Sequence, residues 1–295
     1  MRADGDGWVE CSLGHRHWGL HGAAGLLLYT VTDGEAKVLM QHRAPWCHNG
    51  DTWGIPGGAR DSHEDAVAAA IRESEEEAGI DKSQVTVHRQ TVDDHGDWSY
   101  TTVVGYAPSE LLTTPNQESA ELRWLPLAAN DDLPLHPGFS ATWPSVRAVG
   151  GRILIDLANV VGSTPDGWWR DRAGASARTL HTLSALGNAM VRLPGGGDGV
   201  VVDLVAVVEG QASDVAAPPG IRVVSAPGSG DDTLVMLAND VADAEQLRGP
   251  REKRFLVVVT ADRGLAARLP SSAQVVGPSW LRDQRSKLDR NDSVS

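Results

Sequence analysis

A dense group of acidic side chains lies between Gly57 and Ile80, in the stretch GGARDSHEDAVAAAIRESEEEAGI. On a helix, Glu73, Glu76 and Glu77 recur at i, i+3 and i+4, so their carboxylates share one side. Like charges at this spacing repel one another by roughly a few tenths of a kcal/mol per pair in an isolated helix. A hard cation that prefers oxygen ligands reverses the sign of that interaction. The spacing therefore predicts a divalent metal site.

The residues around these carboxylates favour the same interpretation. Arg72 lies four positions before Glu76, where it is able to brace the carboxylates by hydrogen bonding. Gly57 and Gly58 supply a loop whose backbone can turn sharply, and Gly79 is placed to end the helix in a left-handed conformation. A solvated acidic helix is the alternative. That alternative explains neither the glycine lead-in nor the terminal glycine.

The order of residues from Gly58 is Gly, five residues, Glu64, seven residues, Arg-Glu, Ser74, Glu, Glu-Glu, Ala, Gly, Ile. This pattern resembles the Nudix box at every defining position except Ser74, where the box has an apolar residue. The resemblance implies an Mg²⁺-dependent hydrolase, with Mn²⁺ as an alternative ion, whose substrate is a small molecule linked to a nucleoside diphosphate. Ser74 falls on the stripe with Ile71 and Ala78 that is expected to face the core, away from the carboxylates.

The elements before the box are expected to form the early sheet of such a domain. Gly22 to Met40 reads as two strands joined by a turn at Asp33-Gly34. Arg43 follows the second strand at the lip of the expected pocket, where it either contacts a phosphate or base or is a solvated strand end. Trp53 precedes Pro-Gly-Gly and either packs under the loop, which we prefer, or stacks on a base.

Two groups outside the box are further metal-ligand candidates. Glu118 and Glu121 precede a strand-like segment, and the Nudix resemblance implies that one of them joins the metal cluster without indicating which. A second group near the N-terminus has a spacing that invites a zinc interpretation, and its members are Cys11, His15, His17 and His21. Gly-rich surroundings and the lack of a second Cys pair favour a strand edge for this second group, and we prefer that interpretation.

From Arg152 onwards, short aliphatic runs alternate with helix-like segments. Near-continuous Val, Ile and Leu runs predict a mostly parallel sheet covered on both faces. In such folds ligands bind beyond the carboxyl ends of the strands. Acidic or amide side chains lie at or just after four of these runs: Asp156, Asn159, Glu209, Asp231, Asp232 and Asp262.

These positions resemble the PIN-like nucleases of the NYN type, which implies metal-dependent cleavage of RNA by clustered carboxylates. Helix capping is the alternative for Asp231, Asp232 and Asp262, but it does not account for Asp156 inside an apolar run. The loop around Trp168-Trp169 adds aromatic rings next to arginines. These rings are equally suited to stacking on single-stranded RNA or to filling a domain interface.

A chain of 295 residues with 41% hydrophobic and 22% charged residues is ordinary for a soluble protein of two domains. We expect a Nudix domain over residues 1–149 and a PIN-like domain over 150–295, with a break at Gly150-Gly151 and a disordered tail after about residue 281. Cys11 and Cys47 form no paired pattern, so a reducing cytoplasm is expected. No signal peptide or membrane span is expected, because no apolar run is long enough.

The predicted fold class is α/β, with a Nudix α/β/α sandwich around a mixed sheet followed by a PIN-like, mostly parallel sheet flanked by helices. The predicted function is Mg²⁺-dependent hydrolysis of a diphosphate linkage in a nucleotide derivative or at an RNA end, next to a second, ribonuclease-like domain. The alternative is a nucleotide-sanitising hydrolase with one activity, whose C-terminal domain only binds a partner or RNA.

Overall fold

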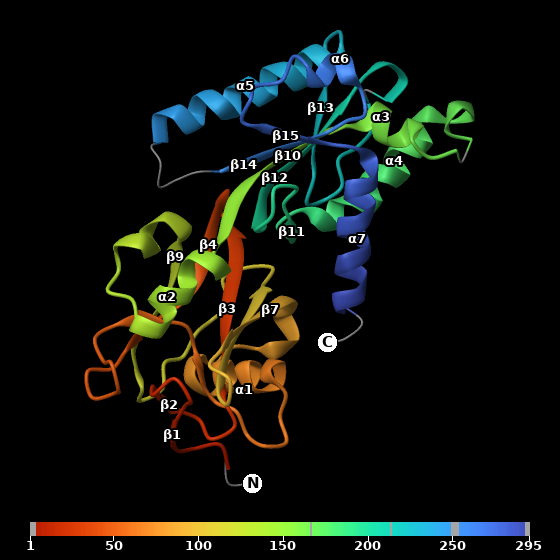
Figure 1. Cartoon of the computed structure of the whole chain (residues 1–295). Coiled ribbons are helices and arrows are strands. Elements are labelled where there is room, and N and C mark those ends of the chain that lie inside the picture. The colour runs from red at the N-terminus through yellow and green to blue at the C-terminus, as the bar shows by residue number, and fades with distance from the viewer. Residues whose placement is uncertain (1–3, 166, 213, 249–253, 293–295) are drawn as a thin grey trace. The chain divides into compact units, whose positions relative to one another are not determined.

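The computed structural model describes residues 4–165, 167–212, 214–248 and 254–292. The chain divides into two compact units, one containing Ala36–Arg147 with the strands before Thr32, the other containing the chain from Ala148 onwards. Each unit has its own α/β architecture and its own mixed sheet (Figure 1). Within the described ranges, no helix combines the length and apolar character needed to cross a membrane.

The first unit is built on a sheet in the order β5-β4-β3-β8-β7, with β6 paired to β3 and β9 paired to β4. β3 pairs in parallel with β8, whereas β4 pairs antiparallel with β5 and β9. A separate antiparallel pair, β1–β2, precedes this sheet. The strands are β1 (Trp8–Glu10), β2 (Arg16–Trp18), β3 (Ala23–Thr32), β4 (Glu35–Arg43), β5 (Trp53–Gly54), β6 (Gly57–Ala59), β7 (Thr86–Asp94), β8 (Ser99–Tyr106) and β9 (Ser119–Pro126).

The predicted hairpin between β3 and β4 is confirmed. Asp33 and Gly34 have φ angles of 56° and 71°, both in the left-handed region that a two-residue hairpin turn requires. The short helices of this unit are the 3₁₀ turns η1 (Lys82–Gln84) and η2 (Leu127–Asp132) and the last helix, α2 (Pro137–Val146).

The acidic stretch forms helix α1 (Ala66–Ala78), whose two ends are both capped. The Asp65 side chain accepts a hydrogen bond from the Ala68 backbone N–H at 2.8 Å. Gly79 adopts φ 67°, and its N–H donates to the Glu75 carbonyl. The alanine-rich face of α1 packs on β3, and Ser74 lies on that buried face with its hydroxyl donating to the Ile71 carbonyl at 2.8 Å. The Ser74 hydroxyl is thus satisfied within the helix, so the irregular box position still packs.

The second unit has a sheet in the order β11-β12-β10-β14-β15, with β13 paired to β12. All of its pairings are parallel except that of β11 with β12, which follows the expected mostly parallel sheet. The strands are β10 (Ala148–Asp156), β11 (Met190–Arg192), β12 (Asp198–Val208), β13 (Arg222–Ser225), β14 (Phe255–Val259) and β15 (Ala273–Val276). The helices are α3 (Leu157–Gly162), η3 (Trp168–Arg170), α4 (Arg172–Leu183), η4 (Ser184–Leu186), η5 (Gly210–Ala212), α5 (Gly230–Arg248), α6 (Arg263–Ala266) and α7 (Pro278–Asp292).

Helices cover this parallel sheet on both sides. α5 and α7 lie on opposite sides of the strands (Figure 1). Leu234 and Leu237 of α5 join Leu154, Val205 and Val258 of the strands in one buried cluster. Because the strand side chains alternate between faces, this cluster fills only one side of the sheet.

Two features of the second unit differ from the sequence prediction. Gly150 and Gly151 do not mark a break, because both lie inside β10. A Cβ on Gly151 would lie 2.3 Å from the Phe255 carbonyl oxygen, so this glycine permits the close approach of a neighbouring strand. The segment after residue 281 is helical in α7 rather than disordered, because Leu281 and Leu288 are buried at a spacing of two helical turns.

Candidate active site and a second acidic cluster

Glu77 is the most deeply buried carboxylate of α1, with a 5% exposed side chain. Its Oε2 atom accepts hydrogen bonds from the Gly57 backbone N–H at 2.8 Å and from Gln41 Nε2 at 3.3 Å. Gln41 also donates to the Ser119 hydroxyl at 2.8 Å. Burial raises the pKa of Glu77 to about 7, although the Gly57 hydrogen bond opposes the rise, and the charge of Glu73 adds to it. The structure thus holds this carboxylate in one orientation, and its burial raises the free energy of the charged form.

Arg72 ties the other acidic side chains of the box together. Its Nε and Nη2 atoms donate to the two carboxylate oxygens of Glu64 at 2.8 and 3.0 Å, and Nη2 also donates to the Ala59 carbonyl. Its Nη1 atom donates to Glu73 at 2.7 Å and to Glu76 at 3.3 Å. Two oxygens of Glu64 and one of Glu73 therefore take most of the guanidinium donors.

The two glycines before the helix allow a close backbone approach. A Cβ on Gly58 would lie 2.6 Å from the carboxylate carbon of Glu73, and a Cβ on Gly57 would lie 2.5 Å from the Gly25 Cα. The Tyr100 hydroxyl would be 3.1 Å from the same Gly57 Cβ. Any side chain at these positions would displace the carboxylate or the strand behind it.

The donor set of this site suits a hard divalent cation. Glu73, Glu76 and Glu77 offer only oxygen ligands, and Arg72 is the cation that contacts two of them. Burial raises the pKa of Glu73 as it does that of Glu77, so the charged form of both carboxylates costs free energy that a bound cation would offset.

Glu118 and Glu121 occupy different environments. The charge of Glu118 raises the pKa of Glu77, which places Glu118 within electrostatic reach of the box. Glu121 instead pairs with Arg123 on the same strand. Between the two candidates from the sequence, Glu118 is therefore the one within electrostatic reach of the buried carboxylate.

Arg43 and Trp53 lie on neighbouring strands beside the box. The charge of Arg43 lowers the pKa of Glu77, so its guanidinium is near this carboxylate. Trp53 is 8% exposed and stacks on His42 with ring centroids 4.8 Å apart. The Trp53 ring therefore packs within the unit, against His42.

Sequence reasoning missed the two residues that orient Glu77 from the sheet, Gln41 and Ser119. Gln41 is fully buried within β4, between the apolar residue Met40 and the strand end. A polar amide in a buried apolar run requires a hydrogen-bond partner, so the position of Gln41 in the sequence is the signal that could have indicated a buried polar contact.

In the second unit, Asp156 is held at the carboxyl end of β10. Its Oδ1 atom accepts from the Asn159 backbone N–H at 3.0 Å, and its Oδ2 atom accepts from the Thr260 hydroxyl at 2.8 Å. Asn159 in turn accepts the Ala261 N–H at 2.8 Å through its side-chain oxygen. Asp156 therefore caps α3, which corrects the expectation that helix capping does not account for this residue.

The other predicted acids of this unit gather at the same edge of the sheet, with one exception. Burial raises the pKa of Asp156, and the charges of Asp231 and Glu209 add to the rise. Burial, followed by the charge of Asp262, likewise raises the pKa of Asp231. Glu209 accepts the Gly230 N–H at 2.7 Å, and Asp262 caps α6. Asp232 is the exception, because it is exposed and pairs with Arg268.

Comparison with known proteins identifies the family of the first unit. The family model described as NUDIX domain matches residues 20–145. The putative 8-oxo-dGTP diphosphatase 3 of Mycobacterium tuberculosis is 52% identical over 154 residues, which are 50% of this chain and 71% of that protein. A nucleoside triphosphate pyrophosphatase/Nudix hydrolase fusion protein of Bifidobacterium longum is 41% identical over 153 residues, 49% of this chain and 31% of the fusion.

The crystal structure of the Nudix hydrolase RenU from M. smegmatis is also similar, with 52% identity and a TM-score of 0.46. That match covers 48% of this chain and 93% of RenU. The family is established by the sequence matches, in which the M. tuberculosis protein is covered over more than two thirds of its length. The chain therefore belongs to the Nudix family and is a hydrolase of phosphorus-containing anhydrides.

Proposed function

We propose that the first unit hydrolyses a diphosphate linkage in a nucleoside diphosphate derivative, using Mg²⁺ or Mn²⁺ held by Glu73, Glu76 and Glu77. The observation that carries the proposal is the buried carboxylate of Glu77, which is oriented by Gly57 and Gln41 and has its pKa raised to about 7. Such a costly charge is stabilised by a cation ligated to it. Both cysteines are free, which agrees with action in a reducing cytoplasm.

Each residue of the site has a separate role in this proposal. Glu73, Glu76 and Glu77 supply the metal ligands, and Glu118 is placed to add a further carboxylate. Arg72 is a positioning residue, because its hydrogen bonds hold Glu73 rather than a substrate. When bound, the metal would neutralise charge on the diphosphate and activate water. Glu73 or Glu118 would accept the proton that the attacking water loses.

Arg43 and the glycine loop are the proposed contacts to the substrate. A guanidinium is suited to two phosphate oxygens at once, and the charge of Arg43 already reaches Glu77. The M. tuberculosis relative is named for 8-oxo-dGTP. Nucleoside triphosphates with an oxidised base are therefore the first substrates to test, in line with the nucleotide-sanitising alternative.

A substrate screen with two matched variants tests this function. The full chain with Mg²⁺ is incubated with ordinary and oxidised nucleoside triphosphates, dinucleoside polyphosphates, nucleotide sugars and capped RNA, and released products are measured. Glu77→Gln is expected to lower turnover by roughly 10²–10³-fold. Glu75→Gln is the control, because Glu75 pairs with Lys82 away from the other carboxylates. Equal activity of the two variants, with unchanged circular dichroism, would contradict the proposal.

We also propose a second function for residues 150–295, as a PIN-like domain that cleaves single-stranded RNA with Mg²⁺ or Mn²⁺. The observation that favours it lies at the carboxyl edge of the parallel sheet, where burial raises the pKa of Asp156 and of Asp231 and the charge of Glu209 adds to both rises. Asn159 and Asp262 would complete the polar edge. The exposed ring of Trp169, next to Arg170 in the chain, offers a stacking surface for a base.

Asp156→Asn in the full chain tests the second function. With labelled single-stranded RNA and Mn²⁺, this variant is expected to lose cleavage, whereas the exposed Asp283→Asn keeps it. Absence of cleavage by the unchanged protein would favour the alternative, in which this unit only binds RNA or a partner. Nucleotide hydrolysis measured on the same samples separates this outcome from failure of the Nudix assignment.

A further inference from the structure

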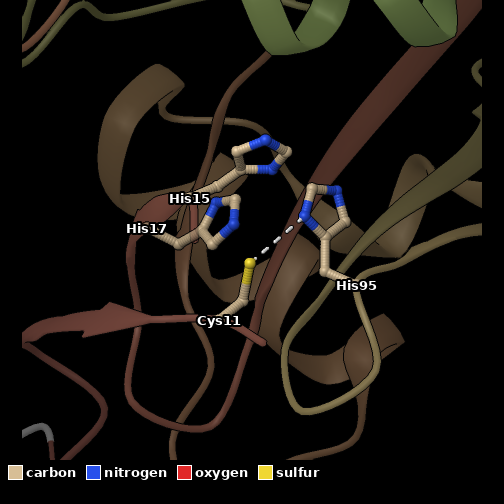
Figure 2. A group of neighbouring side chains, drawn as sticks. All are labelled: Cys11, His15, His17 and His95. Atoms are coloured by element: carbon tan, nitrogen blue, oxygen red, sulfur yellow. Dashed lines mark hydrogen bonds between the residues drawn. The ribbon is translucent and has the colours of Figure 1, made fainter. Parts of the chain in front are cut away.

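Four potential metal ligands converge outside both acidic sites. They are Cys11, His15, His17 and His95, and one ligand atom from each lies within 4.8 Å of the ligand atoms of the others. Figure 2 shows the four side chains pointing toward one another. Cys11 follows β1, His15 and His17 lie before and within β2, and His95 lies in the turn between β7 and β8. The cluster therefore joins two hairpins that are distant in the sequence.

The separation between one thiol and one imidazole of the cluster is close to that expected around a shared metal ion. Cys11 Sγ lies 3.7 Å from His95 Nδ1. Around zinc, a thiolate at about 2.3 Å and an imidazole nitrogen at about 2.0 Å, set at the tetrahedral angle, are about 3.5 Å apart. The thiol and this imidazole are thus already at the spacing that a shared zinc ion requires.

His17 has a donor atom without a partner. Its Nε2 atom is buried and has no hydrogen bond among the residues that the structure describes. The ring is held by stacking on Trp98, with centroids 3.8 Å apart and planes 7° from parallel. A buried, unsatisfied ring nitrogen costs free energy unless something binds it. Simple aromatic packing accounts for the ring of His17 but leaves this nitrogen unexplained.

His95 has the environment of a metal-ligating histidine. Its Nδ1 atom faces Cys11, and its Nε2 atom lies 3.5 Å from Asp93 Oδ2. A carboxylate on the far nitrogen orients the ring and increases its basicity in many zinc sites. The backbone around His95 is also tied down, because Ser12 donates its N–H to Asp97 at 2.9 Å and its hydroxyl to the His95 carbonyl at 3.2 Å.

We propose that Cys11, His15, His17 and His95 form a zinc site, separate from the Nudix metal site. A thiolate with three imidazoles suits zinc better than Mg²⁺ or Ca²⁺, which prefer oxygen ligands. Four protein ligands complete a tetrahedral shell, so the site is structural and leaves no position for a substrate.

The cluster in the structure differs from the group that the sequence suggests. The sequence group contains His21, which is not in the cluster, and omits His95, which is 84 positions from Cys11. With only the N-terminal members in view, a strand edge was the preferred interpretation. The hairpin turn supplies the fourth ligand, and only the fold reveals it.

Zinc at this site would fix the start of β8 against the β1–β2 hairpin. β8 begins four residues after His95 and pairs with β3 at the centre of the sheet. Tyr100, its second residue, lies against Gly25 and Gly57 of the box loop. Loss of zinc is therefore expected to loosen the N-terminal hairpin first. Any effect on the conformation of the Nudix loop is expected to be transmitted through β8.

Zinc content of the purified full chain is the first test. After dialysis against metal-free buffer, elemental analysis is expected to find one zinc per chain. Cys11→Ser and His95→Ala are expected to lose most of it. Cys47→Ser is the matched control, because Cys47 is the other free cysteine and its thiol lies near the Glu118 carbonyl instead. His21→Ala is a second control outside the cluster.

Cobalt substitution separates this site from the Nudix carboxylates. Co²⁺ added to the zinc-free chain is expected to give a near-ultraviolet charge-transfer band, which requires a thiolate ligand. Cys11→Ser should abolish the band, whereas Glu77→Gln and Cys47→Ser should keep it. His15→Ala, at an exposed ligand, tests the site if Cys11→Ser fails to fold. An unchanged chain with neither zinc nor the band, or a folded Cys11→Ser that retains both, would overturn the proposal.

Discussion

The two acidic clusters of this chain gather carboxylates in opposite ways. In the first, Glu73, Glu76 and Glu77 come from one helix, and Arg72 on the same helix contacts two of them. In the second, each acid comes from a different strand end or helix start, and Asp156 is satisfied by neutral groups. A single helix makes its cluster by residue spacing, whereas the parallel sheet makes its cluster by topology.

Both clusters nevertheless use the same local device. In each cluster, one carboxylate lies so close to a glycine that a side chain would not fit there. A Cβ on Gly58 would lie 2.6 Å from Glu73, and a Cβ on Gly230 would lie 2.9 Å from Glu209. In both cases the group that would have to move is the end of a flexible side chain. The glycine therefore leaves the space that the carboxylate occupies, and a larger residue there would displace the carboxylate rather than the backbone.

The largest difference expected between the clusters is in how stability depends on pH. Glu77 has a pKa near 7 in the folded chain and about 4.5 as an ordinary carboxyl group. The folded chain therefore binds a proton that the unfolded chain has released, and metal-free stability should fall as pH rises through this window. The loss should approach about 3 kcal/mol. Denaturant unfolding between about pH 4 and pH 8 measures it.

Two comparisons make this measurement decisive. Glu77→Gln should flatten the pH dependence, and Mg²⁺ should reduce it in the unchanged chain. Asp156→Asn should alter it less, because Asp156 keeps hydrogen bonds from Asn159 and Thr260 that favour its charged form. If both variants flattened the pH dependence of stability equally, the expected difference between the two clusters would be contradicted.

The glycines give the next largest effect. Gly58→Ala should lower nucleotide hydrolysis by about 10²-fold, because a shift of about 1 Å in Glu73 misplaces a metal ligand. Its unfolding midpoint should change little, since the clash is with a side-chain end. Gly57→Ala is the contrasting variant, because its Cβ meets the Gly25 backbone at 2.5 Å and should destabilise the fold. Full activity in Gly58→Ala would show that Glu73 is not held by the loop.

How far the sequence could predict these sites follows from the same contrast. The box helix was predictable because helical spacing is local, and its carboxylates, caps and buried Ser74 face follow from positions within one turn or two. The burial of Glu77 was not predictable, since Gln41 and Ser119 reach it from distant strands. The sheet order that gathers Asp156, Glu209 and Asp231 likewise depends on pairings that no local pattern specifies.

Segment ends were the weakest part of the sequence prediction. Gly150-Gly151 suggested a break because glycine usually interrupts a strand, yet Gly151 serves a close contact with Phe255. Charged residues after Trp280 suggested disorder, yet Leu281 and Leu288 anchor α7. In both places a tertiary contact outweighed the local preference.

Two arginines that pair with acids, one in each unit, are expected to differ in their contribution to stability. Arg72→Ala should cost about 2 kcal/mol, because it leaves Glu64 and Glu73 half-buried without a charged partner, and the 27% exposure of Arg72 keeps the cost below that of a fully buried pair. Arg268→Ala should cause no measurable change, because its partner Asp232 is 69% exposed. Urea unfolding of both variants gives the comparison. Equal losses would mean that Arg72 is as dispensable as a surface arginine.

The smallest effect concerns how the box helix ends. Gly79 holds φ 67°, so Gly79→Ala should cost about 1 kcal/mol in left-handed strain, and Gly79→Asn should cost less because Asn tolerates that conformation. In the second unit, α4 ends at Ser184 in a right-handed conformation and continues into η4, so Ser184→Ala should fall within about 0.5 kcal/mol of the unchanged chain. Thermal unfolding distinguishes the two cases. If Gly79→Ala were as mild as Ser184→Ala, the left-handed cap would not be what ends α1, and the position of Glu77 in the last turn would depend on its strand contacts alone.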